Sequence, residues 1–146
     1  MNDKFLIFLI GSYFLAFSVN LMPAIKHPDL DVNVFHLLVT LFFMLLLLMY
    51  SKKGSKKLKV FALVGVISGL LVFVITTFEH AMFEHVILNS IAALQYPFYL
   101  IFTTPVFGGN MLFDLSYGSY SLLVSLFYGV VFVLTNFFRK NDAVSV

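Results

Sequence analysis

Long apolar runs that contain no Asp, Glu, Lys or Arg constrain this chain more than any other feature. They cover residues 5–22, 34–50, 60–78 and 119–138. A helix rises about 1.5 Å per residue, so about 20 residues match the hydrocarbon core of a bilayer, which is about 30 Å thick. A soluble domain of this size has too little interior to bury four such helices. Each run therefore predicts a transmembrane helix.

The composition agrees with a single all-α integral membrane domain over residues 1–146. Hydrophobic residues make up 61% of the chain and charged residues 11%, and the mean hydropathy is +1.01. The sequence has no cysteine, which excludes disulfides, thiol nucleophiles and thiolate metal ligands. It also has no tryptophan, so tyrosine is the residue expected at the membrane interfaces.

The cations of the chain are concentrated in one short turn. Five lysines surround Gly54 between the second and third runs: Lys52, Lys53, Lys56, Lys57 and Lys59. Positive charge in short loops is retained on the cytoplasmic side of a membrane. This places both termini in the cytoplasm, together with Arg139 and Lys140, and puts the acidic loop at residues 23–33 outside. We therefore expect a multi-pass protein of the inner (plasma) membrane with cytoplasmic N- and C-termini.

The first run also fits a second interpretation, a secretory signal peptide. Lys4 precedes an apolar stretch in which Ala16 and Ser18 form the small-x-small pattern of a cleavage site. We favour retention of this run as a membrane span.

Residues 79–113 are too apolar for an aqueous loop of that length. We expect an amphipathic helix over residues 79–96, followed by a broken segment that dips into the outer leaflet or re-enters the membrane. The alternative is a fifth span over residues 86–107, which would carry Pro97 and Pro105 through lipid and move the C-terminal cations outside. The predicted fold is therefore a four-transmembrane-helix bundle with an extra amphipathic or re-entrant segment on the outer side.

Small residues recur on one face of two predicted helices. Gly65 and Gly69 form a GxxxG pair in the third run, and Ser121, Ser125 and Gly129 are spaced four residues apart in the last run. Small side chains let helices approach closely inside a membrane. These strips predict either packing between the two helices of one chain or a seam in a homo-oligomer.

Three polar residues lie near the ends of predicted spans. Asn20 and Asn136 are neutral, and we expect them to form hydrogen bonds between helices. His36 lies about one turn inside the second run, where an ionisable side chain either reaches the headgroups or belongs to a proton or ion path.

The densest ionisable cluster outside the lysine turn is EHAMFEH, residues 79–85. His80 and Glu84 would share one face of a helix. With His85 they predict either a hydrated helix start or a pH-sensing group, because histidine changes charge near neutral pH. The pattern is not HExxH and offers at most two or three ligands, so we expect no metal site.

Residues 103–110, TTPVFGGN, combine proline and glycine beside an apolar stretch. Such a sequence permits a re-entrant turn with exposed carbonyls, as in a selectivity filter. Asp114 is the only acid nearby and, with His36, is a candidate for the lining of an ion path.

No catalytic constellation is evident. The predicted spans contain no Asp or Glu, and Ser68, Ser121 and Ser125 have no neighbouring base in the sequence. We expect no enzymatic activity and no cofactor.

The leading interpretation is a non-enzymatic scaffold or sensor that self-associates and couples the envelope or outer leaflet to a cytoplasmic protein. The lysine turn would bind that partner or anionic lipid. A small oligomeric ion channel or pore is the alternative, and a small transporter is least favoured because inverted repeats and charged intramembrane residues are missing. The expected partners are the bilayer, further copies of the chain and a soluble cytoplasmic protein; the cations flank apolar runs, so no direct contact with nucleic acid is expected.

Overall fold

A computed structural model describes the backbone of residues 3–144 and the side chains of residues 4–141. Within that part of the chain the regular elements are all helical, without any strand. Five segments are long and apolar enough to cross a membrane: Lys4–Lys26, Val34–Ser51, Lys56–Phe83, Val86–Leu112 and Tyr117–Asn141. The fold is therefore consistent with an all-α membrane protein, as predicted. A bundle of four is not confirmed, because Val86–Leu112 is also long and apolar enough.

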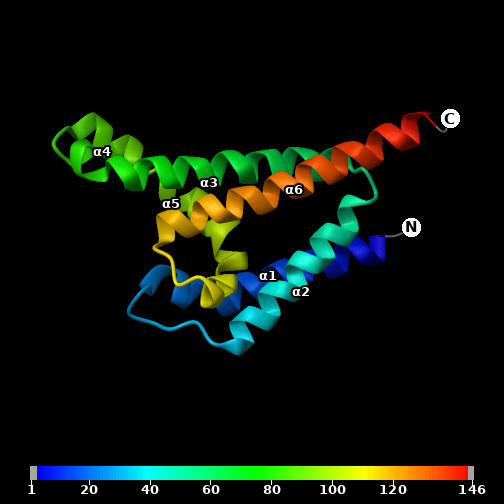
Figure 1. Ribbon diagram of the computed structural model, residues 1–146, viewed down its shortest axis with the longest axis horizontal. Coiled ribbons are helices and arrows are strands. Elements are labelled where there is room, and N and C mark those ends of the chain that lie inside the picture. The colour runs from blue at the N-terminus through cyan, green and yellow to red at the C-terminus, as the bar shows by residue number, and fades with distance from the viewer. Residues whose placement is uncertain (1–2, 145–146) are drawn as a thin grey trace.

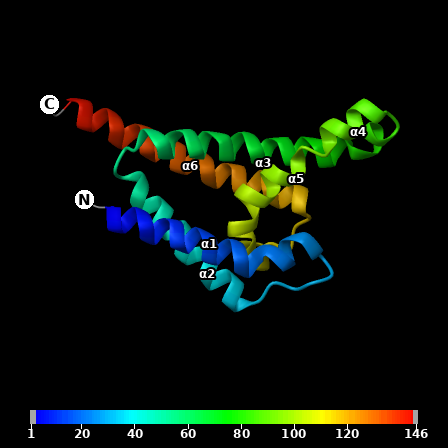
Figure 2. The ribbon, with the colours of Figure 1, turned by 180° about the vertical axis from the view of Figure 1, so that it is seen from behind.

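The four longest helices form two pairs. Helix α1 (Asp3–Lys26) packs along α2 (Val34–Ser51), and α3 (Lys56–Phe83) packs along α6 (Tyr117–Val144), as Figure 1 and Figure 2 show. Within each pair the two helices run in opposite directions. The pairs lie roughly one above the other in Figure 1.

The lysine turn between α2 and α3 packs against the last turns of α6. Gly54 has a φ of +61°, a conformation that glycine adopts without strain. A Cβ atom at this position would lie 2.8 Å from the Arg139 backbone. The start of α1 lies at the same end of the molecule (Figure 1). We call it the basic end, and the other the opposite end.

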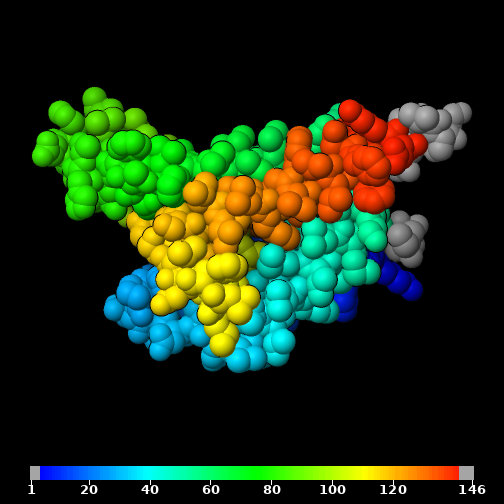
Figure 3. All heavy atoms as spheres, viewed as in Figure 1, coloured from blue at the N-terminus to red at the C-terminus, as the bar shows by residue number. Residues whose placement is uncertain are grey.

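Residues 84–116 leave α3 and enter α6 at the opposite end (Figure 1). In chain order they form α4 (Val86–Ala92), α5 (Gln95–Phe98), the π-helical turn η1 (Tyr99–Thr103) and the 3₁₀ helix η2 (Thr104–Leu112). We call residues 95–112 the inserted segment, because they pass between the two helix pairs (Figure 2). The later part of the segment, η2, packs on α1 and α2. In Figure 3 the yellow stretch that leads into α6 covers the space between α6 and the α1–α2 pair.

The sequence explains why the inserted segment is not one regular helix. Pro97 and Pro105 have no backbone N–H, so neither can donate a helical hydrogen bond. Gly108 is required for packing, since a Cβ atom there would overlap the carbonyl oxygen of His36 and the hydroxyl of Thr40. The irregular backbone lets η2 approach α2 closely.

Helices α1, α3 and α6 extend beyond the predicted runs. Helix α1 continues past Pro23 to Lys26, and the carbonyl of Ala24 in its last turn accepts a hydrogen bond of 2.9 Å from the Tyr99 hydroxyl. A tertiary partner therefore supports the helix beyond the proline. The expected helix over residues 79–96 is not formed as one unit: α3 runs on to Phe83, because no proline or glycine occurs between residues 70 and 96 to end it earlier.

Candidate functional site

The centre of the molecule is a set of hydrogen bonds between the inserted segment and all four long helices. Irregular backbone frees carbonyl groups, which need partners wherever water is absent. Side chains of α1, α2, α3 and α6 supply them: Tyr13 Oη to Ile101 O (2.8 Å), Asn20 Nδ2 to Pro105 O (3.2 Å), Thr40 Oγ1 to Pro105 O (3.5 Å), Ser68 Oγ to Phe98 O (3.1 Å), Tyr120 Oη to Val106 O (2.5 Å) and Tyr128 Oη to Phe102 O (2.8 Å). The segment is thus held from both helix pairs at once.

The predicted filter stretch, residues 103–110, lies inside this arrangement. All eight residues are buried. The carbonyls of Pro105 and Val106 already accept side-chain hydrogen bonds, and the Asn110 amide bonds both the N–H and the carbonyl of Leu115. Within one chain the stretch is a packed core element, and its last residue, Asn110, borders a polar cavity of about 380 Å³.

Three buried polar atoms of the described residues have no hydrogen-bond partner: Asn20 Oδ1, Gln95 Oε1 and Thr104 Oγ1. Such groups are costly to bury. Gln95 borders a cavity of about 440 Å³ at the opposite end, which Tyr99 and Tyr117 also line.

The two asparagines predicted to join helices do so. Asn20 of α1 donates to the Thr40 hydroxyl of α2 at 2.9 Å. Asn136 of α6 accepts from the Lys59 ammonium of α3 at 2.8 Å. Both predictions are confirmed, and together the two bonds tie each helix pair internally.

The five lysines of the basic end fall into two groups. Lys53 lies over the rings of Phe5 and Tyr50, at 5.3 and 4.9 Å from their centroids, and Lys59 bonds Asn136. The other three, Lys52, Lys56 and Lys57, are exposed. Two lysines therefore stabilise the fold, and three present their charge to the surroundings.

The small residues of α3 face α6 within the same chain. A Cβ atom at Gly65 would lie 2.6 Å from the Tyr128 ring, and one at Gly69 would lie 2.6 Å from Cβ of Ser125 and would overlap the carbonyl oxygen of Ser121. Gly129 differs, since its nearest neighbour is Val66 at 3.9 Å. It borders an open groove of about 500 Å³ between α3 and α6.

The ionisable candidates all lie at the opposite end but are not assembled into one site. His80, Glu84 and His85 are exposed around the turn from α3 to α4, so they flank a helix end where we expected a helix start. Glu84 is the C-cap of α3 and His85 is the N-cap of α4. In the part of the chain that the structure describes, no three His, Asp or Glu residues are placed to hold a metal ion.

His36 and Asp114 each have a local structural role. His36 belongs to a capping box at the start of α2: its Nδ1 accepts from the Asn33 N–H at 3.2 Å, and its own N–H donates to Asn33 Oδ1 at 3.3 Å. Asp114 has a φ of +48° in the turn after η2. It borders a polar cavity of about 380 Å³ together with His27 and Asp31.

Sequence reasoning missed the tyrosines as the main donors to the inserted segment. We expected tyrosine at the membrane interfaces, yet Tyr120 and Tyr128 are 4% and 0% exposed and point into the core. The available signal was their spacing of eight residues, which puts them about 80° apart around α6 and so on one broad side of the helix. Their acceptors are far away in sequence, so the pairing itself could not be read from the pattern.

Comparison of the chain with models of known protein families, with curated proteins and with solved structures found no match.

Proposed function

We propose that this chain is a non-enzymatic membrane scaffold that presents the basic end to an acidic protein in the cytoplasm. The observation that carries the proposal is the division of the lysines at the basic end. Two of them support the fold, whereas three are exposed on a frame held together by the inserted segment. Exposed cations on a rigid support favour recognition of a negatively charged partner.

The same proposal includes four membrane spans, a re-entrant inserted segment and cytoplasmic termini in the inner membrane. Residues 84–116 begin and end on one side of the molecule (Figure 1), which suits re-entry better than a fifth crossing. The buried irregular backbone also suits re-entry, since it is tolerated at membrane depth only when protein covers it. The charge rule then places the basic end in the cytoplasm.

Self-association is part of the proposed role. The groove between α3 and α6 is apolar, open and bordered by Gly129, and Leu126, Val130 and Val133 beside it are 63%, 52% and 63% exposed. A helix from a second copy can approach closely where side chains are small.

Orientation is tested with single cysteines in this cysteine-free chain. Gly54 is a poor labelling site, because its φ of +61° and its contact with Arg139 make substitution there strained. Lys56→Cys at the basic end and Asp31→Cys at the opposite end are exposed instead. A membrane-impermeant maleimide should label Asp31→Cys in intact cells and Lys56→Cys only after permeabilisation. The reverse pattern would overturn the proposed orientation.

Partner binding is tested by replacing Lys52, Lys56 and Lys57 with glutamine. Cross-linked cytoplasmic proteins that copurify with the wild-type chain should be lost from this triple variant. The same three positions changed to arginine should retain them, because arginine keeps the charge. Lys26→Gln, at the opposite end, controls for loss of any one lysine. Equal recovery of the same proteins with the glutamine and arginine variants would contradict the proposal.

The pore interpretation receives less support. A filter needs carbonyl groups directed at a water-filled path. The carbonyls of Ile101, Phe102, Pro105 and Val106 instead accept hydrogen bonds from side chains of α1 and α6. We expect the purified protein to be silent in a liposome ion-flux assay.

A further inference from the structure

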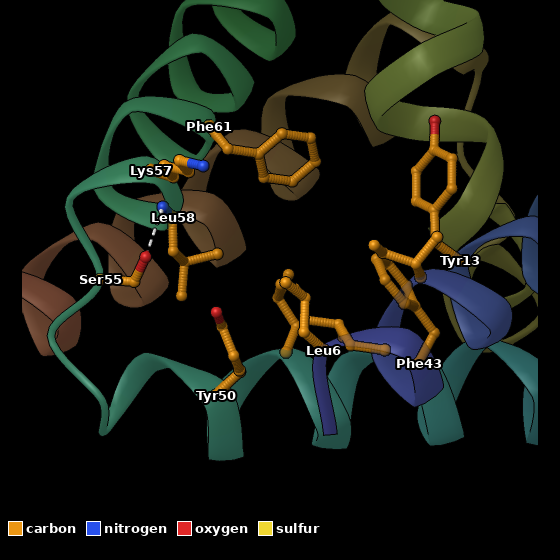
Figure 4. A pocket seen from close by; sticks show the side chains of 11 residues that line it. Leu6, Tyr13, Phe43, Tyr50, Ser55, Lys57, Leu58 and Phe61 are labelled. Atoms are coloured by element: carbon orange, nitrogen blue, oxygen red, sulfur yellow. Dashed lines mark hydrogen bonds between the residues drawn. The ribbon is translucent and has the colours of Figure 1, made fainter. Parts of the chain in front are cut away.

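A cavity of about 290 Å³ lies between α1, α2 and α3 near the basic end. Its walls are almost wholly apolar, as Figure 4 shows. The side chains that form most of the walls are Leu6, Leu9, Phe43, Leu47, Leu58 and Phe61. An apolar cavity of this kind does not bind water well.

The cavity is the part of the space between the helix pairs that the inserted segment does not fill. The Tyr13 hydroxyl donates a hydrogen bond to the Ile101 carbonyl, and the centroids of the Phe61 and Phe102 rings lie 5.1 Å apart. Tyr13 and Phe61 are also the lining residues farthest along α1 and α3 from the basic end. Tyr13 and Phe61 therefore line the inner end of the cavity and also contact the inserted segment. From Tyr13 to Leu6 the cavity follows α1 for about 10 Å.

Three residues that carry polar groups line the other end of the cavity. Tyr50, Ser55 and Lys57 line it, and Figure 4 shows the three on the side of the cavity away from Tyr13. Ser55 Oγ accepts from the Leu58 N–H at 3.4 Å, which leaves its hydroxyl proton free to donate. The Lys53 ammonium lies 4.9 Å from the centre of the Tyr50 ring. Lys57 thus lines this end of the cavity, and the Lys53 ammonium lies over the ring of Tyr50, which also lines it.

The side formed by α1 is accessible to a membrane ligand. Leu6 and Ile10 both line the cavity and are 38% and 47% exposed. Helix α1 packs on α2 and η2, whereas α3 packs mainly on α6. A chain entering from the surrounding lipid meets apolar side chains first and finds the cations at the membrane surface.

We propose that this cavity binds one acyl chain of an anionic phospholipid, whose phosphate lies beside Lys57 and Lys53 and accepts from Tyr50 and Ser55. Charge complementarity decides the headgroup, because two cations and two hydroxyl donors suit a phosphate with net negative charge. The apolar walls favour an acyl chain in the cavity, because burying its methylene groups stabilises the bound lipid. The site rests on the proposed placement in a membrane and does not depend on a cytoplasmic partner.

The test uses the full chain in nanodiscs that contain a phosphatidylglycerol with a photoreactive group in one acyl chain. Cross-linked residues are identified by peptide mass spectrometry. We expect adducts concentrated on the stretches that line the cavity, around Leu6 to Tyr13 and around Leu47. Adducts spread evenly over the exposed apolar faces of all helices would overturn the proposal.

Leu47→Phe fills the cavity from α2 and leaves every lysine in place. It should lower cavity cross-linking about tenfold, as expected when about two methylene groups are excluded. Leu45→Phe is the matched control, because Leu45 is on the same helix and 59% exposed. If Leu47→Phe is not recovered as a folded protein, Leu6→Phe at the 38% exposed rim replaces it. Equal cross-linking by the filled and control variants would refute the site.

Lys57→Gln tests the headgroup. Competition of unlabelled phosphatidylglycerol against the probe should weaken about fivefold, in line with the loss of one cation near the membrane surface. Lys52→Gln in the same turn does not line the cavity and should have no effect on this competition. If phosphatidylcholine competes as well as phosphatidylglycerol with the wild-type chain, the anionic assignment is wrong. Because Leu47→Phe keeps the exposed lysines, loss of lipid binding and loss of partner binding are separable.

Discussion

The hydrogen bonds from α6 to the inserted segment provide the most direct test of the fold. Tyr128 is fully buried, and its hydroxyl donates to the Phe102 carbonyl at 2.8 Å. Tyr120 is 4% exposed and donates to the Val106 carbonyl at 2.5 Å. Replacing either tyrosine with phenylalanine removes one oxygen atom and keeps the ring. The Tyr128 ring lies edge-on to Phe102, 5.7 Å away, and phenylalanine preserves that contact.

The expected loss of stability follows from the buried acceptor. A hydrogen bond between membrane helices is worth about 0.6 kcal/mol on average and up to about 1.7 kcal/mol. Leaving a buried carbonyl unpaired costs about 1–3 kcal/mol. We therefore expect about 1–2 kcal/mol for each single variant. The two acceptors lie in different turns, η1 and η2, and share no donor. The double variant should lose about 2–4 kcal/mol, close to the sum of the two single effects.

The assay is unfolding of the purified protein in mixed micelles by titration with a denaturing detergent, together with amide hydrogen exchange over residues 99–107. Tyr96→Phe is the control, because Tyr96 is 55% exposed, and should change stability by less than about 0.5 kcal/mol. Both single variants should also exchange faster over the inserted segment. If Tyr120→Phe and Tyr128→Phe are as stable as Tyr96→Phe, and exchange is unchanged, then the inserted segment is not held by these bonds.

Two further substitutions test local packing and capping. Gly108→Ala should destabilise the protein by about 1–3 kcal/mol in the same titration, because its Cβ atom would meet the His36 backbone, which cannot move aside as a side chain can. Gly11→Ala is the comparison: no described atom beyond its own helix lies within 4 Å of an added Cβ, so it should be neutral or stabilising by up to about 1 kcal/mol. Asn33→Ala should cost about 1 kcal/mol and speed amide exchange in the first turn of α2, since Asn33 Oδ1 accepts from the Phe35 N–H at 3.0 Å. Equal stability of Gly108→Ala and Gly11→Ala would contradict the packing of Gly108. Unchanged amide exchange in α2 of Asn33→Ala would contradict the capping role of Asn33.

The pattern of the sequence was sufficient for the parts of the fold that depend on local composition. Apolar runs predicted the four longest helices. Asn20 and Asn136 were correctly expected to bond between helices, because a polar side chain within an apolar run needs a partner. Helix ends were less accurate: α1 passes Pro23, because the Tyr99 hydroxyl, distant in sequence, supports the Ala24 carbonyl.

The central hydrogen bonds could not be predicted, since each joins residues far apart in the chain. The bond from Tyr13 to Ile101 spans 88 residues, and the one from Asn20 to Pro105 spans 85. Periodicity places a side chain on a helix face but says nothing about which face meets it. The same limit hid the cavity beside Lys57, whose walls come from three separate helices.

The sequence by itself determined that this chain is helical, apolar and strongly cationic at one turn, because the length of the apolar runs and the position of charge are properties of the chain. Only the tertiary structure decided where residues 95–112 go and which lysines remain exposed. The physical reason is that a freed carbonyl or an ammonium group takes whichever partner the packing brings near it. For Lys53 and Lys59 that partner lies within the chain, whereas Lys52, Lys56 and Lys57 are left exposed.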